Sequence, residues 1–119
     1  MKYEDVLHRC FRCGFCKLTD DYEYFNCPPH KKYRLESFSP GGRMWLTRAW
    51  LLGEVQMTER FQQILYSCTM CANCVSHCIF PFNEDLVNIF TAAREAVVEE
   101  GRLPAAVRNY FTSLQIYGN

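Results

Sequence analysis

Eight cysteines carry the most reactive side chains of this 119-residue chain, and all of them fall into two groups. The first group consists of Cys10, Cys13, Cys16 and Cys27. The second group, in the segment CTMCANCVSHC, consists of Cys68, Cys71, Cys74 and Cys78. Thiolates are strong metal ligands, and grouped cysteines in a reducing compartment are typical of metal or redox sites.

The spacing within the groups favours iron–sulfur chemistry. Three cysteines at two-residue gaps can wrap three corners of a cubane 4Fe–4S cluster, and the fourth ligand then comes from elsewhere. A cysteine that closely follows the third tends to point away and to ligate the other cluster. We therefore expect two 4Fe–4S clusters with crossed ligation. One is expected to bind Cys10, Cys13, Cys16 and Cys78, and the other Cys68, Cys71, Cys74 and Cys27.

Other uses of these cysteines stay open at this point. Structural zinc usually takes two separated cysteine pairs, so zinc would leave one thiolate of each triplet idle. A disulfide framework needs an oxidising compartment, but the N-terminus, MKYEDVLHRC, has acidic residues where a signal peptide has its apolar stretch. An iron–sulfur regulatory or assembly module would use the same eight ligands. His77 lies between ligand positions, and we expect it to be a loop or core histidine.

Composition argues against several classes of function. The chain has 13 basic and 13 acidic side chains, whereas nucleic-acid binding asks for a basic face. No apolar run reaches the ~18 residues of a membrane span, because Arg48 and Glu54 interrupt the richest segment. We find no nucleophile–base pair and no phosphate-binding glycine loop, so no catalysis is expected from this chain alone. The length fits a single domain, residues 1–119, and the expected location is the cytoplasm.

Helices are expected on both sides of the second cysteine group. Residues 43–52 carry apolar side chains three and four positions apart, and Gly53 would end that helix. Thr58 is a suitable N-cap for a helix that leads into the second group. Asn83 is expected to cap a longer helix that ends at Gly101. The core face of this longer helix is predicted to consist of Leu86, Ile89, Phe90, Ala93, Ala96 and Val97.

The remaining segments are predicted to be two helices and a loop. Residues 2–9 are expected to form a short helix, and Pro104 suits the first turn of a last helix. Residues 17–42 contain three prolines and two glycines and are predicted to be loop. No segment shows the alternation of a strand, so the predicted fold class is all-α.

Several motifs together resemble the two-cluster helical ferredoxin module. The motifs are CGFC at 13–16, CP at 27–28, SPGGR at 39–43 and CTMCANCVSHC at 68–78. This module forms the C subunit of heterodisulfide reductases and the N-terminal part of glycolate oxidase and lactate-utilisation iron–sulfur proteins. The likeness spans about residues 7–100. It implies a helical ferredoxin fold with all eight cysteines as ligands, and it places Arg43 at the end of the SPRGR-like segment.

The resemblance also implies a place in a larger assembly. Such modules act as electron-transfer subunits of oxidoreductases, often in anaerobes. Full-length relatives add domains with adjacent cysteine pairs, and this chain has no such pair. The expected partners are therefore larger subunits that carry a flavin, a cysteine-pair domain or a metal, with any membrane contact made through a partner. The last helix is the expected docking element through Tyr110, Phe111, Ile116 and Tyr117.

Overall fold

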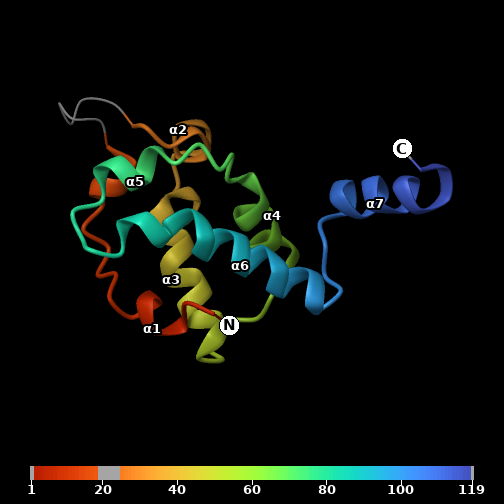
Figure 1. Cartoon of the computed structure of the whole chain (residues 1–119), viewed down its shortest axis with the longest axis horizontal. Helices are drawn as coiled ribbons and strands as arrows, with labels where there is room; N and C mark the ends of the chain where they lie inside the picture. The colour runs from red at the N-terminus through yellow and green to blue at the C-terminus, as the bar shows by residue number, and fades with distance from the viewer. Residues whose placement is uncertain (1, 19–24, 119) are drawn as a thin grey trace.

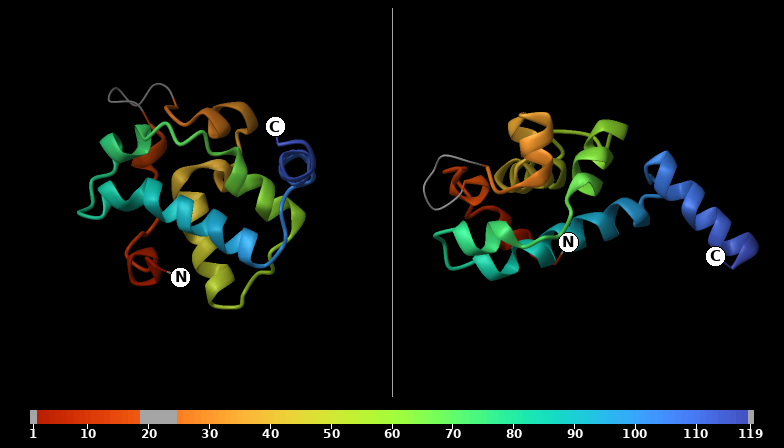
Figure 2. Two further views of the ribbon diagram at one scale, coloured as in Figure 1. Left: turned by 45° about the vertical axis from the view of Figure 1, so that its right-hand side comes forward. Right: turned by 90° about the horizontal axis from the view of Figure 1, so that it is seen from above.

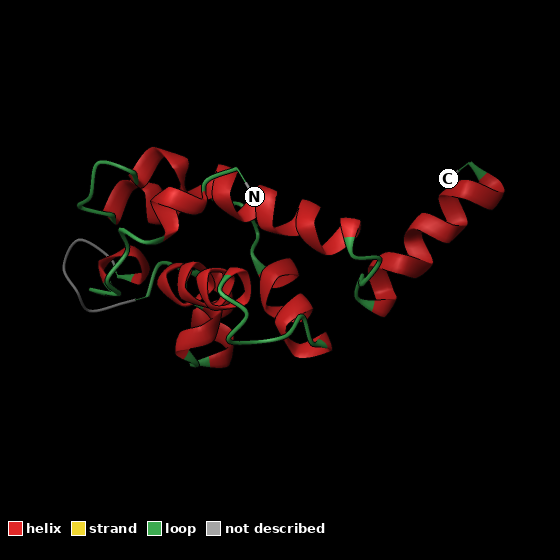
Figure 3. Ribbon diagram, turned by 90° about the horizontal axis from the view of Figure 1, so that it is seen from below, coloured by secondary structure: helices red, strands yellow, loops and turns green. Residues whose placement is uncertain are grey.

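Helices make up the fold in a computed structural model of the chain, which describes residues 2–18 and 25–118. The α-helices are α1 Glu4–Leu7, α2 Pro28–Tyr33, α3 Pro40–Leu51, α4 Glu59–Ser67, α5 Asn73–His77, α6 Leu86–Glu99 and α7 Ala105–Tyr117. Short 3-10 helices are η1 Phe15–Lys17, η2 Glu36–Phe38 and η3 Asn83–Asp85. Within the described ranges no strand occurs, and the extended pairing is one isolated bridge between Leu18 and Phe25 (Figure 3). The all-α fold class is confirmed.

Helices α3 and α6 form the centre of the fold, and α1 and α4 pack against them (Figure 1). The buried apolar side chains form two groups. The group beside the cysteines includes Leu7, Met44, Leu86, Ile89 and Phe90. The group between α4 and the end of α6 consists of Met57, Phe61, Leu65, Ala93 and Val97. All six side chains predicted for the core face of α6 are buried, so that prediction is confirmed.

The prediction of a continuous loop over residues 17–42 is wrong, because α2, η2 and the first turn of α3 lie there. Proline has a fixed φ that suits the first helical position, where its missing N–H would have had no partner. Pro28 begins α2 and Pro40 begins α3. The Ser39 hydroxyl caps α3 by accepting a hydrogen bond from Gly42 N at 3.0 Å. The prolines therefore mark helix starts in this segment.

His30 on α2 is buried, and its pKa is lower than that of an exposed histidine. Burial lowers the pKa of His30, and the charges of Lys17 and Arg34 add to this effect while Glu36 opposes it. An unfolded histidine titrates near ~6.5, so below that pH the unfolded chain binds a proton that the folded chain does not. We expect the free energy of unfolding to fall as the pH drops from roughly 7.5 to roughly 5.5, two values on either side of the ordinary histidine pKa. This fall should be smaller in His30→Gln.

Urea unfolding of both proteins at the two pH values measures this difference. Acid effects on the cysteines are common to both proteins and cancel in the comparison. An equal pH dependence in the two proteins would contradict the assignment to His30.

The two predicted N-caps have different outcomes. Thr58 Oγ1 accepts a hydrogen bond from Phe61 N at 3.2 Å at the start of α4, so this cap is confirmed. Asn83 does not cap α6, because its Nδ2 donates to Val75 O at 3.1 Å and α6 begins after η3. The side chain therefore ties η3 to α5 instead.

Replacing Thr58 by alanine is expected to destabilise the protein by about 1 kcal/mol, because it removes the acceptor for an N–H at the start of α4. Thermal or urea unfolding measures the change. Thr91→Ala is the matched control: Thr91 is exposed inside α6, where alanine is the better helix former, so no loss is expected. Equal losses in the two variants would contradict the capping role.

Helix α7 extends away from the other helices, as Figure 1 and the right-hand view of Figure 2 show. Gly101 has φ 70° after the end of α6, as expected of a helix stop, and Pro104 lies directly before α7. No residue of α7 is buried. Tyr110, Ile116 and Tyr117 are each more than 60% exposed, at 63%, 65% and 76%. The helix therefore contributes its apolar side chains to the surface.

No helix in the described part of the chain is both long and apolar enough to cross a membrane.

Candidate metal centre

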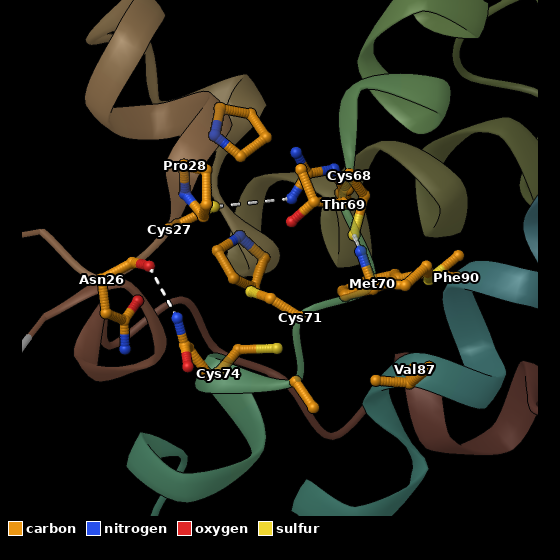
Figure 4. Close-up of a pocket in the computed structure, with 15 residues that line it drawn as sticks. Asn26, Cys27, Pro28, Cys68, Thr69, Met70, Cys71, Cys74, Val87 and Phe90 are labelled. Carbon is orange, nitrogen blue, oxygen red and sulfur yellow. Dashed lines mark hydrogen bonds between the residues drawn. The ribbon is translucent and has the colours of Figure 1, made fainter.

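Two cavities, one for each set of four cysteines, lie on either side of the N-terminus of α3. Cavity A, of ≈330 Å³ including space open to solvent, is lined by Cys27, Cys68, Cys71 and Cys74. Figure 4 shows these four side chains around one space, with Cys27 contributed from a distant part of the sequence. The three cysteines of the second triplet thus line the same cavity as Cys27, the last cysteine of the first group.

Cavity B has a similar volume, ≈360 Å³, and is lined by Cys10, Cys13, Cys16 and Cys78. Its other walls are mainly apolar and include Met44, Phe80, Phe82 and Leu86. The structure therefore brings the cysteines together in the crossed sets that the spacing predicts. Ligation by these eight sulfur atoms stays a prediction.

The fold brings the two cysteine groups side by side through α5 and η1. Helix α5 carries Cys74 and is followed by Cys78, and it packs closely on η1, which carries Cys16. Pro40, at the first position of α3, lines both cavities. A single side chain is therefore common to their walls, and the two cavities are neighbours.

The two cysteine triplets have the same backbone pattern. Arg12 and Met70, each two residues after the first cysteine of its triplet, have φ of 59° and 58°. Gly14 and Ala72, each directly after the second cysteine, have φ of 87° and 65°. Left-handed backbone is strained for residues other than glycine and is found most often at functional sites. The repeated strain indicates that both loops are shaped for the same task, although the sequence pattern shows only the cysteine spacing.

Four of the eight thiols are difficult to ionise. Burial raises the pKa of Cys16 to about 12 and that of Cys74 to about 12, and neighbouring cysteines add to both shifts. Burial also raises the pKa of Cys10 and Cys78. A buried thiolate is therefore unfavourable in this fold unless a positive partner such as a metal compensates its charge.

A buried arginine lies beside cavity A. Arg43 is 1% exposed, and its Nε donates to Ile64 O at 3.1 Å and its Nη2 to Ser67 Oγ at 3.2 Å. Its Nη1 lies 3.9 Å from Cys27 Sγ. Figure 4 draws this interaction as the dashed line that ends at the Cys27 sulfur. The family resemblance places Arg43 at the end of the SPRGR-like segment and implies no role for it. The sequence feature that could have indicated its burial is the position of Arg43 directly after SPGG, at the start of an apolar helix.

Sequence reasoning also missed Arg94 on α6. The Arg94 guanidinium donates to the carbonyl oxygens of Leu65 and Cys68, which holds the end of α4 against α6. Burial lowers the pKa of Arg94, and Cys68 opposes this shift. No simple pattern marks this residue, because arginines at helix surfaces are common.

The histidines lie outside both cavities. His77 Nδ1 is 2.9 Å from Asn73 O and 2.9 Å from Asn26 Nδ2, and His8 Nδ1 accepts from Arg48 Nε at 3.1 Å. Within the described residues no three His, Cys, Asp or Glu side chains converge to hold a single metal ion. The thiols instead lie around the walls of the two cavities.

The donor set of each cavity fits an iron–sulfur cluster. A 4Fe–4S cluster takes four cysteine thiolates, and each cavity is lined by four cysteines with no carboxylate beside them. All eight cysteines are free thiols, so none is used in a disulfide bond. The buried thiols would also gain the positive partner that their ionisation needs.

Comparisons with known proteins give one match. Residues 6–80 match the family described as 4Fe-4S dicluster domain, a range that covers more than half of the chain and includes all eight cysteines. No curated protein and no solved structure matches the chain. The cysteine-lined cavities and this match lead to the same assignment: the chain belongs to the 4Fe–4S dicluster domain family.

Proposed function

We propose that this protein is an electron-transfer subunit of a larger oxidoreductase, with one 4Fe–4S cluster in each cavity. The observation that supports this most directly is the division of eight cysteines into two sets of four around neighbouring cavities. When bound, each cluster supplies a centre that accepts and releases one electron.

The chain's own residues have three tasks in this function. The cysteines would bind the clusters. The residues with left-handed backbone in both triplets shape the loops that carry these cysteines. Apolar side chains such as Phe82, Leu86 and Phe90 line the cavities and exclude water. Pro40 lines both cavities, so the two sites are neighbours, which favours passage of an electron between them.

The finer assignment follows the resemblance to the C subunit of heterodisulfide reductases. We propose partners that carry a flavin, a cysteine-pair domain or a further metal centre, in an anaerobic and cytoplasmic setting, with any membrane contact made through a partner. The protein itself performs no substrate chemistry in this assignment.

Anaerobic purification tests the proposed function. We expect about eight irons per chain, absorption near roughly 400 nm and a reversible one-electron reduction at each site. Zinc in place of iron would exclude the proposal in favour of an interaction module. Two clusters without a reversible couple would favour a regulatory or assembly module instead.

Helix α7 is the proposed docking element for the partner. It lies apart from the cysteine-bearing helices and exposes Tyr110, Phe111, Ile116 and Tyr117. Such a group of exposed aromatic and aliphatic side chains is typical of a protein interface.

Truncation after Pro104 removes α7 and keeps Arg102, which donates to Met57 O at 3.1 Å, and Leu103, which packs on the core. It is expected to keep the iron content and to abolish assembly with the partner, because no α7 residue is buried. Size-exclusion chromatography of the protein purified from its native host, with metal analysis of the eluted chain, measures both. Tyr117→Ser with Ile116→Ser, a change on α7 alone, should reproduce the loss. A truncated chain that still elutes in the larger assembly would contradict this docking role.

A further inference from the structure

We propose that Arg43 raises the reduction potential of the cavity A site above that of the cavity B site, so that cavity A holds the first electron. The inference rests on the proposed function, since it requires a cluster in each cavity. It gives Arg43 the role of a positioning residue that acts through its charge.

The Arg43 guanidinium is fixed in place and buried. Hydrogen bonds to Ile64 O and Ser67 Oγ orient it, and its remaining nitrogen lies 3.9 Å from Cys27 Sγ. Its charge is 1% exposed, so neither water nor salt screens it effectively. A one-electron reduction adds negative charge at the site, and a fixed positive charge beside the site stabilises that added charge.

Cavity B has no matching charge among its lining residues. Its one cationic lining residue is Arg12, which is exposed and lies over the Trp45 ring at 4.6 Å. Solvent weakens the field of an exposed guanidinium far more than that of a buried one. On the cavity A side, the half-buried Arg94 adds charge of the same sign through its contact with Cys68 O.

A second cation near cavity B is Lys17, which lies beside Gly14 of its wall, but the Glu36 carboxylate pairs with it and offsets its charge. The two volumes are similar, ≈330 and ≈360 Å³, and each cavity has one exposed cysteine, Cys71 in A and Cys13 in B. Backbone N–H groups reach sulfur at both: Met70 N donates to Cys68 Sγ at 3.4 Å, and Gly41 reaches Cys16. The field of a neutral N–H dipole falls off faster with distance than that of a full charge, so Arg43 is the dominant asymmetry.

The electron balance is simple. Cavity A gains one electron when cavity B, or a reduced flavin or iron–sulfur centre of the partner, loses one. No bond forms or breaks in the chain. The expected consequence is that electrons enter at either site and rest at cavity A before they leave to the acceptor.

An EPR-monitored redox titration of the anaerobically purified full-length protein tests the proposal, with dithionite as the reductant. Wild-type protein should show two one-electron steps. Cys27→Ser, which alters a wall of cavity A alone, should change the signal of the higher-potential step. Arg43→Gln should lower the reduction potential of that step by at least about 59 mV, which is a tenfold change in the equilibrium constant for one electron. Arg43→Lys keeps the positive charge, so its reduction potential should stay close to that of the wild-type protein.

Arg60→Gln is the matched control, since Arg60 is exposed and lines neither cavity. It should leave both steps unchanged. Equal shifts in Arg43→Gln and Arg60→Gln, or a higher-potential step that Cys27→Ser leaves untouched, would overturn the proposal. The Cys27→Ser result assigns the higher-potential step to a cavity without any Arg43 variant. It therefore tests the proposal even if Arg43→Gln fails to fold. Wild-type protein without two clusters would instead overturn the proposed function.

Discussion

Replacing Cys78 by alanine is expected to empty cavity B and to leave cavity A loaded, although Cys78 belongs to the second cysteine group in the sequence. Cavity B is lined by Cys78 and the first triplet, so the loss of this thiol leaves three sulfur atoms for a cluster that takes four. The iron content should fall from about eight to about four per chain. The melting temperature should fall as well, because the link between the two halves is lost.

Alkylation of the anaerobic protein, followed by peptide mass mapping, shows which cavity is empty. In Cys78→Ala the first triplet should react, and Cys68, Cys71 and Cys74 should stay protected. Cys27→Ala should give the reverse pattern. Ser76→Ala, on the exposed face of the same helix α5, is the control and should retain all the iron. Alkylation of the second triplet in Cys78→Ala would show that the ligand sets are not crossed.

Replacing Gly42 by alanine is expected to prevent normal folding around α3. A Cβ at Gly42 would lie 2.0 Å from Glu36 O, 2.8 Å from Ser37 Cα and 2.9 Å from Glu36 C. All three are backbone atoms of the η2 turn, so no side-chain rotation relieves the contact. Overpacking of this kind costs about 3 kcal/mol or more, and here it acts on the turn that leads into both cavities.

Gly41→Ala is the matched control for Gly42→Ala. A Cβ at Gly41 would meet only Cys16 Sγ, at 3.7 Å, which is an ordinary contact. Alanine also favours a helix over glycine by roughly 0.5–1 kcal/mol, so little destabilisation is expected there. Thermal unfolding of the two variants measures the difference. A Gly42→Ala protein as stable as Gly41→Ala would contradict the close contact between α3 and η2.

The sequence was most informative where periodicity and capping agree. Helix α4 was predicted from Thr58 onwards, and the core face of α6 was predicted residue by residue, because apolar side chains there repeat with the helical period. Helix α2 was missed, since PPHKKY has neither an apolar stripe nor the length that reveals one. Its formation depends on proline at the first position and on tertiary contacts, which no local pattern expresses.

The pattern of the candidate site was easier to predict than its surroundings. Cysteine spacing alone suggested the crossed sets that line cavities A and B, because ligand geometry limits which sulfur atoms can share a cluster. The place of Arg43 could not be predicted, since burial of a guanidinium depends on carbonyl and hydroxyl partners from α4. The role of Asn83 was mispredicted for a similar reason: its partner Val75 lies in a different element.

The position of α5 also bears on how the protein is made. Helix α5 and the residue after it provide the last sulfur atom of both cavities, Cys74 for A and Cys78 for B. During translation six thiols leave the ribosome before either site has its full wall. Delivery of iron must therefore wait until most of the chain has been synthesised, and the nascent thiols need protection from oxidation until then.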